Sequence, residues 1–161
     1  MRITVNISDA RVSAKADDLI VTYSLGSCIG VTLYDPLNRV GGMLHYQLPT
    51  SALDADRARA NPTMFADSGM EVLIQRMKEA GARFDKLQVC VAGAAQILDD
   101  AGVFNIGKRN HAAIRKILWA KGLLIQQEDV GGSSPRNMYL NVADGAVEIR
   151  PVGLSKSASE K

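Results

Sequence analysis

Cysteine, histidine and tryptophan are scarce in this chain of 161 residues, which has two, two and one of them, respectively. Cys28 and Cys90 can form at most one disulfide, and we expect both to be free thiols in a reducing compartment. No spacing between them and His45 or His111 matches the short ligand pairs that bind zinc. We therefore predict neither a metal site nor a cofactor.

Long apolar runs and blocks of like charge are also missing. No stretch approaches the roughly 18 apolar residues of a membrane-spanning helix, and the N-terminus MRITVNISDA contains no signal-peptide core. Nineteen basic and seventeen acidic side chains give a net charge of +2. These features predict a cytoplasmic protein that neither inserts into membranes nor binds nucleic acid.

The composition is that of a globular domain, since 47% of the residues are hydrophobic and can fill one core. We predict a single domain over residues 1–152. The last nine residues, GLSKSASEK (153–161), lack core-forming side chains and are expected to form a mobile tail.

Apolar runs indicate a domain rich in β-strands, with Asp144-Gly145 typical of a tight hairpin turn. The predicted strands cover residues 3–7, 19–23, 29–34, 40–46, 87–91, 123–127, 137–142 and 146–150. Because helical segments interrupt them, we expect an α+β domain with mixed or antiparallel strands flanked by helices.

Two segments show helical spacing of apolar residues. The first begins at Asn61-Pro62, suited to an N-cap and a first-turn proline, and ends at Gly81. The second covers residues 110–121, with Gly122 as its C-terminal cap. The preceding segment FNIGKRN (104–110) is interpreted as a polar loop entering this helix.

Cys28 lies in the segment SLGSCIG (24–30), whose small residues would let a substrate approach the sulfur. A cysteine can act as a nucleophile when a base takes its proton and backbone N–H groups face the developing oxyanion. Gly26 and Ser27 are the candidates for that second role. The alternative is a small buried side chain, because free cysteines are often buried.

His45 is the candidate base, because residues 29–34 and 40–46 can pair as a hairpin that brings it near Cys28. Such a base would favour the thiolate of Cys28 near neutral pH. Thr22 could orient the base, and it shares a face with Ser24 and Cys28 if the strand stays regular. His111 is expected to be solvated or to take part in helix capping.

Several motifs occur together, in order, along most of the chain: LGSC (25–28), LYDP (33–36), GGMLH (41–45), IGKRN (106–110) and DVGG (129–132). With them the sequence resembles the CheD family of chemoreceptor glutamine deamidases. The resemblance implies a nucleophile at Cys28, a base at His45 and Thr22 as third member. It also implies a layered, αββα-like sandwich of the cysteine hydrolase type. AGAA (92–95) departs from the family's usual GGA run, and Tyr46-Gln47 replaces a more apolar pair.

The resemblance further implies that the protein converts specific receptor glutamines to glutamate, with hydrolysis of receptor methyl esters as a second reaction. It implies a CheC-type phosphatase as a partner, and Phe104 is our candidate for that contact. The alternative is a non-catalytic module that docks the phosphatase or the receptor. An adaptor would not need a nucleophile and a base together, which favours the enzyme.

Overall fold

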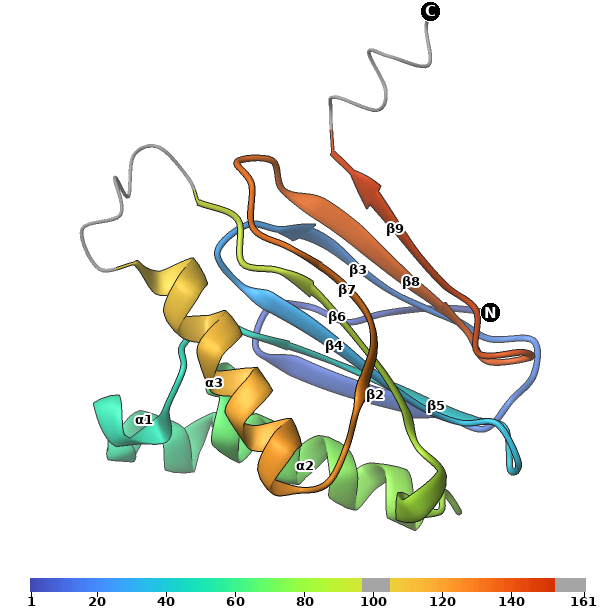
Figure 1. Cartoon of the computed structure of the whole chain (residues 1–161). Helices are drawn as coiled ribbons and strands as arrows, with labels where there is room; N and C mark the ends of the chain where they lie inside the picture. Colours follow the sequence, from blue (N-terminus) through green and yellow to red (C-terminus); the bar gives the residue numbers. More distant parts are fainter. Residues whose placement is uncertain (97–104, 153–161) are drawn as a thin grey trace, which may run out of the picture.

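The computed structural model describes residues 1–96 and 105–152, which form two β-sheets packed face to face with helices on one side (Figure 1). One sheet has five strands in the order β2 (Asp9–Ser13), β5 (Val40–Tyr46), β4 (Ile29–Asp35), β6 (Gln88–Gly93) and β7 (Ile125–Val130). The other has four, in the order β1 (Arg2–Thr4), β3 (Leu19–Leu25), β8 (Arg136–Asn141) and β9 (Val147–Pro151). Each sheet is mixed, because β6–β7 and β1–β3 are parallel and the other pairs antiparallel.

The helices α1 (Ala55–Ala60), α2 (Ala66–Glu79) and α3 (Ile106–Ala120) lie on the side of the five-stranded sheet (Figure 1). Single 3-10 turns occupy Ser51–Leu53, Pro62–Met64 and Phe84–Lys86. The predicted α+β layered sandwich is confirmed, and in the described ranges its layers are helix, sheet and sheet. None of the described helices is long and apolar enough to cross a lipid bilayer.

Strand β4 forms part of two apolar cores, and this explains its nearly continuous hydrophobic sequence. Ile29, Val31 and Leu33 pack under the helices, whereas Tyr34 belongs to the cluster between the two sheets. All seven residues of β4, and all seven of β5, are buried. A strand that is covered on both faces reads as an apolar run rather than as an alternation.

The two helix starts differ from the prediction. Asn61 and Pro62 begin a 3-10 turn, and α2 starts only at Ala66 because Phe65 is extended, with φ −119° and ψ 148°. Helix α3 starts at Ile106, before the predicted residue 110, after a left-handed Asn105. FNIGKRN is therefore largely the first turn of a helix rather than a loop.

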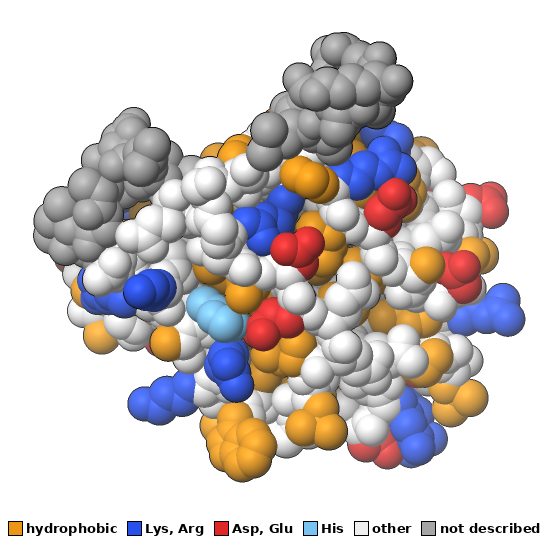
Figure 2. Space-filling view, turned by 45° about the horizontal axis from the view of Figure 1, so that its top comes forward, with side chains coloured by type: hydrophobic (Ala, Val, Ile, Leu, Met, Phe, Trp, Pro, Cys, Tyr) orange, Lys and Arg blue, Asp and Glu red, His pale blue; other side chains and the backbone are white. Residues whose placement is uncertain are grey.

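Two further elements were not predicted. β2 pairs with β5 at the sheet edge and has only Ala10 and Val12 as apolar residues, too few to give a strand pattern. Helix α1 is short and buries none of its residues. The predicted hairpins β4–β5 and β8–β9 are both present. On the face shown in Figure 2, basic and acidic side chains are interspersed with apolar ones.

The hairpin turn at Gly145 provides a test of the inter-sheet packing. Gly145 has φ +78°, and a Cβ there would lie 2.3 Å from Tyr34 Cδ2. Gly122 has a similar φ of +73° with nothing within 4 Å. Gly122→Ala should cost about 1 kcal/mol of unfolding free energy from backbone strain alone. Gly145→Ala should cost about 2 kcal/mol more, because Tyr34 must move. Urea denaturation of both variants measures the difference, and equal losses would contradict the contact.

Candidate active site

Residues 26–28, which we call the nucleophile loop, join β3 to β4. Each of their three carbonyl groups accepts a hydrogen bond. The N–H of Ala95 donates to the first at 2.7 Å, and the N–H of Ala94 donates to the third at 2.9 Å. Asn110 Nδ2 donates to the second at 2.9 Å. Donors from the two residues that follow β6 and from α3 thus fix the backbone on which the Cys28 thiol is carried.

The N–H groups of Ser27 and Cys28 point to no protein acceptor other than the Cys28 thiol within the described ranges. Because no other described acceptor binds them, these N–H groups remain available to a negatively charged oxygen next to the sulfur. Ser27 keeps its predicted role, while Gly26 takes part through its carbonyl, which accepts from Ala95. Their assignment to an oxyanion site stays a prediction.

Gly93 allows the close approach between β6 and the nucleophile loop. It has φ +117°, and a Cβ at this position would lie 2.2 Å from the Cys28 carbonyl oxygen. Gly107 plays a similar part at the start of α3, where a Cβ would lie 2.9 Å from the Ala94 oxygen. Within AGAA, the glycine therefore stands at the position that contacts the loop, while Ala94 adopts φ +55°.

His45 and Thr22 come from different sheets and meet in the interior, on β5 and β3 respectively. Thr22 Oγ1 and His45 Nδ1 are 2.8 Å apart, and both residues are at most 1% exposed. Thr22 also donates its hydroxyl hydrogen to the Val5 carbonyl at 2.7 Å. Because a hydroxyl has one hydrogen, Oγ1 must accept from the imidazole. Nδ1 therefore carries the proton, and Nε2 is left with its lone pair.

The Nε2 atom of His45 is buried and has no hydrogen-bond partner among the described residues. Burial lowers the pKa of His45 to about 4, because the charged imidazolium would lose its hydration. The side chain is thus a neutral base with a free lone pair near neutral pH. A buried acceptor without a donor costs roughly 1–3 kcal/mol, which marks this atom as a functional candidate.

Cys28 lies just before β4, next to the cross-strand pairs Ile29–Tyr46 and Gly30–His45. His45 lies directly opposite Gly30, and Cys28 is two residues before Gly30. Cys28 is partly buried and packs against the cluster between the two sheets, the layer in which Thr22 meets His45.

The thiol differs from the sequence-based expectation in its charge. Burial raises the pKa of Cys28 to about 11, and hydrogen bonding from its own N–H offsets this only in part. Together with the lowered pKa of His45, this makes a neutral thiol and a neutral imidazole the resting pair. This direction disfavours the thiolate that we expected near neutral pH, because the surroundings do not solvate its charge.

The remaining candidates lie away from this cluster. His111 Nε2 is 2.7 Å from Glu128 Oε2 on the surface of α3. Cys90 is buried on β6, opposite Thr32 of β4. Ser24 does not share the face of Thr22, because the strand bulges between Thr22 and Leu25. Phe104 lies outside the described residues.

Asn110 ends the motif IGKRN, but sequence analysis assigned no role to it. It is fully buried, and its Nδ2 binds both the Ser27 carbonyl at 2.9 Å and the Gln47 carbonyl at 2.8 Å. It therefore ties the nucleophile loop to the chain just after His45. The signal was its helical spacing from Ile114, which put a polar residue on the buried face of α3.

Together, a thiol, a neutral imidazole of fixed tautomer and unpaired backbone N–H groups can carry out acyl transfer at an amide or ester. This is the chemistry of thiol-dependent hydrolases. The family model described as CheD chemotactic sensory transduction matches residues 47–151 of the chain. The chain belongs to the CheD family.

Relatives from distant organisms align over almost the whole chain. A "Probable chemoreceptor glutamine deamidase CheD" of Solibacter usitatus is 43% identical, over 96% of this chain and 92% of the relative. One of the same name from Thermococcus kodakarensis is 40% identical, over 97% and 96%. A CheD 1 of Syntrophus aciditrophicus is 45% identical, over 94% of each. A Neisseria meningitidis DUF152 structure covers 82% of this chain and 63% of its own, with TM-score 0.46 and 11% identity.

The charge state of Cys28 predicts its alkylation. With a pKa of about 11, Cys28 should react slowly with iodoacetamide at pH 7. Its rate should rise about tenfold per pH unit up to that value, since the thiolate is the reacting form. Cys90 should react still more slowly in the folded protein, because it is buried.

Mass mapping of alkylated peptides between pH 6 and pH 10 measures both rates. A rate at Cys28 that levels off near pH 7 would restore the thiolate expected from the sequence. Faster labelling of Cys90 than of Cys28 would contradict the assigned burial of the two thiols.

Proposed function

We propose that this protein deamidates glutamine side chains of chemoreceptors to glutamate, with Cys28 as nucleophile, His45 as base and acid, and Thr22 as its orienting partner. The observation that carries the proposal is the hydrogen bond from His45 Nδ1 to Thr22, which leaves Nε2 buried and unpaired on a residue that pairs with Gly30, two residues after Cys28. The names of the relatives supply the substrate class.

In the first half-reaction, the Cys28 sulfur attacks the amide carbon while its proton passes to His45 Nε2. The carbonyl oxygen becomes an oxyanion that accepts from the N–H groups of Ser27 and Cys28. The imidazolium then returns the proton to the amide nitrogen, so that the C–N bond breaks, ammonia leaves and a thioester remains. Thr22 stabilises the imidazolium by accepting from Nδ1 throughout.

In the second half-reaction, His45 takes a proton from water as the water oxygen attacks the thioester. The tetrahedral intermediate collapses, the sulfur leaves with the proton from Nε2, and the product is a glutamate side chain. A methyl ester would follow the same route with methanol as leaving group. Hydrolysis of receptor methyl esters is therefore a second reaction within the same proposal.

The proposal keeps two further predictions from the sequence. One is a cytoplasmic location. The other is a CheC-type phosphatase as a partner that binds through Phe104, for which the test is loss of binding in Phe104→Ala with unchanged thermal stability. Binding that Phe104→Ala leaves unchanged would remove this residue from the interface.

The proposed reaction is tested by incubating the protein with a receptor fragment and measuring ammonia release and peptide mass. Each modified glutamine should gain about 1 Da, with one ammonia released per site. Cys28→Ala and His45→Ala should remove nearly all turnover, whereas Cys90→Ala and His111→Ala should retain it. Thr22→Val should lower kcat at least about tenfold, because the imidazole loses the partner that fixes its tautomer. Equal mass gain with Cys28→Ala would contradict the nucleophile and favour the binding module.

The pH dependence of turnover follows from the environment of His45. Its pKa is lowered to about 4, so the base stays unprotonated down to that pH, and kcat/KM should be flat between about pH 5 and pH 8. Below pH 5 it should fall as Nε2 becomes protonated. Initial rates of ammonia release between pH 3.5 and pH 8, with folding checked by circular dichroism, measure this profile. A limb near the ordinary histidine pKa of about 6.5 would contradict the buried base.

A further inference from the structure

We propose that Arg136, which lies outside the Cys28, His45 and Thr22 cluster, is a positioning residue that holds the nucleophile loop in place. Its effect on turnover rests on the proposed function, whereas its effect on the chemistry of the Cys28 thiol does not.

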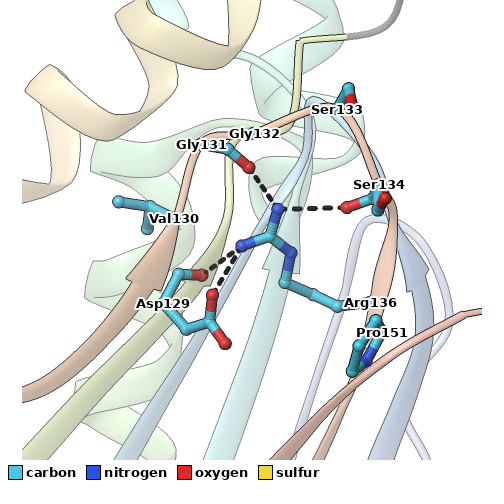
Figure 3. Close-up of a pocket in the computed structure, with 8 residues that line it drawn as sticks. All are labelled: Asp129, Val130, Gly131, Gly132, Ser133, Ser134, Arg136 and Pro151. Atoms are coloured by element: carbon cyan, nitrogen blue, oxygen red, sulfur yellow. Dashed lines mark hydrogen bonds and ion pairs between the residues drawn. The ribbon is translucent and has the colours of Figure 1, made fainter. Parts of the chain in front are cut away.

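The guanidinium group holds the segment 129–134, which links β7 toward β8 (Figure 3). Nη1 donates to the Asp129 carbonyl and to Asp129 Oδ1, both at 2.8 Å. Nη2 donates to the Gly131 carbonyl and to the Ser134 carbonyl, the latter at 3.0 Å. Three of the four acceptors are backbone oxygens, so the side chain fixes the path of the segment rather than the position of one partner side chain.

The segment held by Arg136 in turn holds the chain that binds the nucleophile loop. The Gly131 N–H donates to the Gly93 carbonyl at 2.9 Å, and the Gln96 N–H donates to the Gly132 carbonyl at 2.7 Å. Residues 94 and 95, which lie between these two contacts, donate to the nucleophile loop. Three successive hydrogen bonds therefore connect the guanidinium to residues 26–28.

The backbone of Arg136 reaches the same loop from the other sheet. Arg136 pairs with Leu25, the residue directly before Gly26, at the end of the β3–β8 ladder. Its side chain leaves β8 on the buried side, in the row that continues with Met138 and Leu140. One residue thus connects the start of the nucleophile loop in the four-stranded sheet to the end of β7 in the five-stranded sheet.

Apolar packing does not replace this connection. A pocket of about 290 Å³ borders the segment and is lined by Ser133, Ser134 and Pro151 among others (Figure 3). Gly131 and Gly132 both have positive φ and lack side chains that could anchor them. A lysine could not occupy the four acceptors, because its ammonium is a single point charge on a flexible stem, whereas the guanidinium is a planar fork.

Arg136→Lys should lower kcat and raise the alkylation rate of Cys28. A loosened loop should misplace the sulfur and lower kcat by on the order of 10- to 100-fold, with KM changed less than about threefold. The same loosening should admit water to the thiol, whose raised pKa is caused by burial, so that Cys28 is alkylated faster at pH 8 than in the wild type. A change that merely destabilised the fold would expose Cys90 as well.

The matched control is Arg150→Lys on the neighbouring strand β9. Arg150 binds Glu148 at 2.7 Å and lies over the Tyr139 ring in the four-stranded sheet, but it is exposed. This variant should leave both kcat and the alkylation rate of Cys28 unchanged. If Arg136→Lys does not fold, Asp129→Asn tests the same clamp, because it weakens one charged contact of a half-exposed carboxylate. It should show both effects at smaller size.

The proposal is overturned if folded Arg136→Lys keeps kcat within about twofold of wild type, or if Cys28 and Cys90 gain reactivity in equal proportion. It is supported if kcat falls while the reactivity of Cys28 alone rises. If the wild type releases no ammonia from the receptor fragment, the proposed function fails, and the alkylation measurement still decides the role of Arg136.

Discussion

The hydrogen bond between His45 and Thr22 is the interaction on which the candidate site depends, because it joins the two sheets at the proposed base. A histidine on one sheet obtains its tautomer from a threonine on the other, and that threonine is committed in turn to the Val5 carbonyl. Any shift between the sheets would change the distance between Oγ1 and Nδ1. The layered packing therefore sets the chemistry of the imidazole as well as the stability of the domain.

Two buried polar atoms of the described residues are left without partners, and both belong to the site: His45 Nε2 and Asn110 Oδ1. Each costs roughly 1–3 kcal/mol, a large share of the stability of a domain of this size. The hydrogen bonds to residues 26–28 and the packing of Gly93 and Gly107 against neighbouring carbonyls offset this cost locally. The site thus keeps the Nε2 lone pair of His45 free at a cost in folding stability.

The sequence predicted much of the fold, because β4, β5 and the apolar face of α2 carry strong periodic signals. The predicted contact between Thr22 and His45 is present, whereas the approach of Cys28 to His45 stays a prediction. The contacts of Asn110 and Arg136 could not be predicted, because each side chain binds backbone carbonyls, and a carbonyl has no residue-specific signature. The neutral thiol could not be predicted either, since it depends on burial produced by both sheets.

The bulge in β3 has a consequence for the length of this segment. Thr22 pairs with Met138 and Leu25 with Arg136, so three steps along β3 correspond to two along β8, and Ser24 takes φ +57° to absorb the extra residue. Side chains three apart on a regular strand face opposite ways, yet Thr22 and Leu25 are both buried. The extra residue therefore changes which strand face Thr22 shares with the residues that lead into the nucleophile loop. The number of residues between Thr22 and Cys28 is therefore constrained, whatever their identity. A deletion of one residue here would change how Thr22 is oriented relative to the nucleophile loop, whereas a substitution would leave that orientation unchanged.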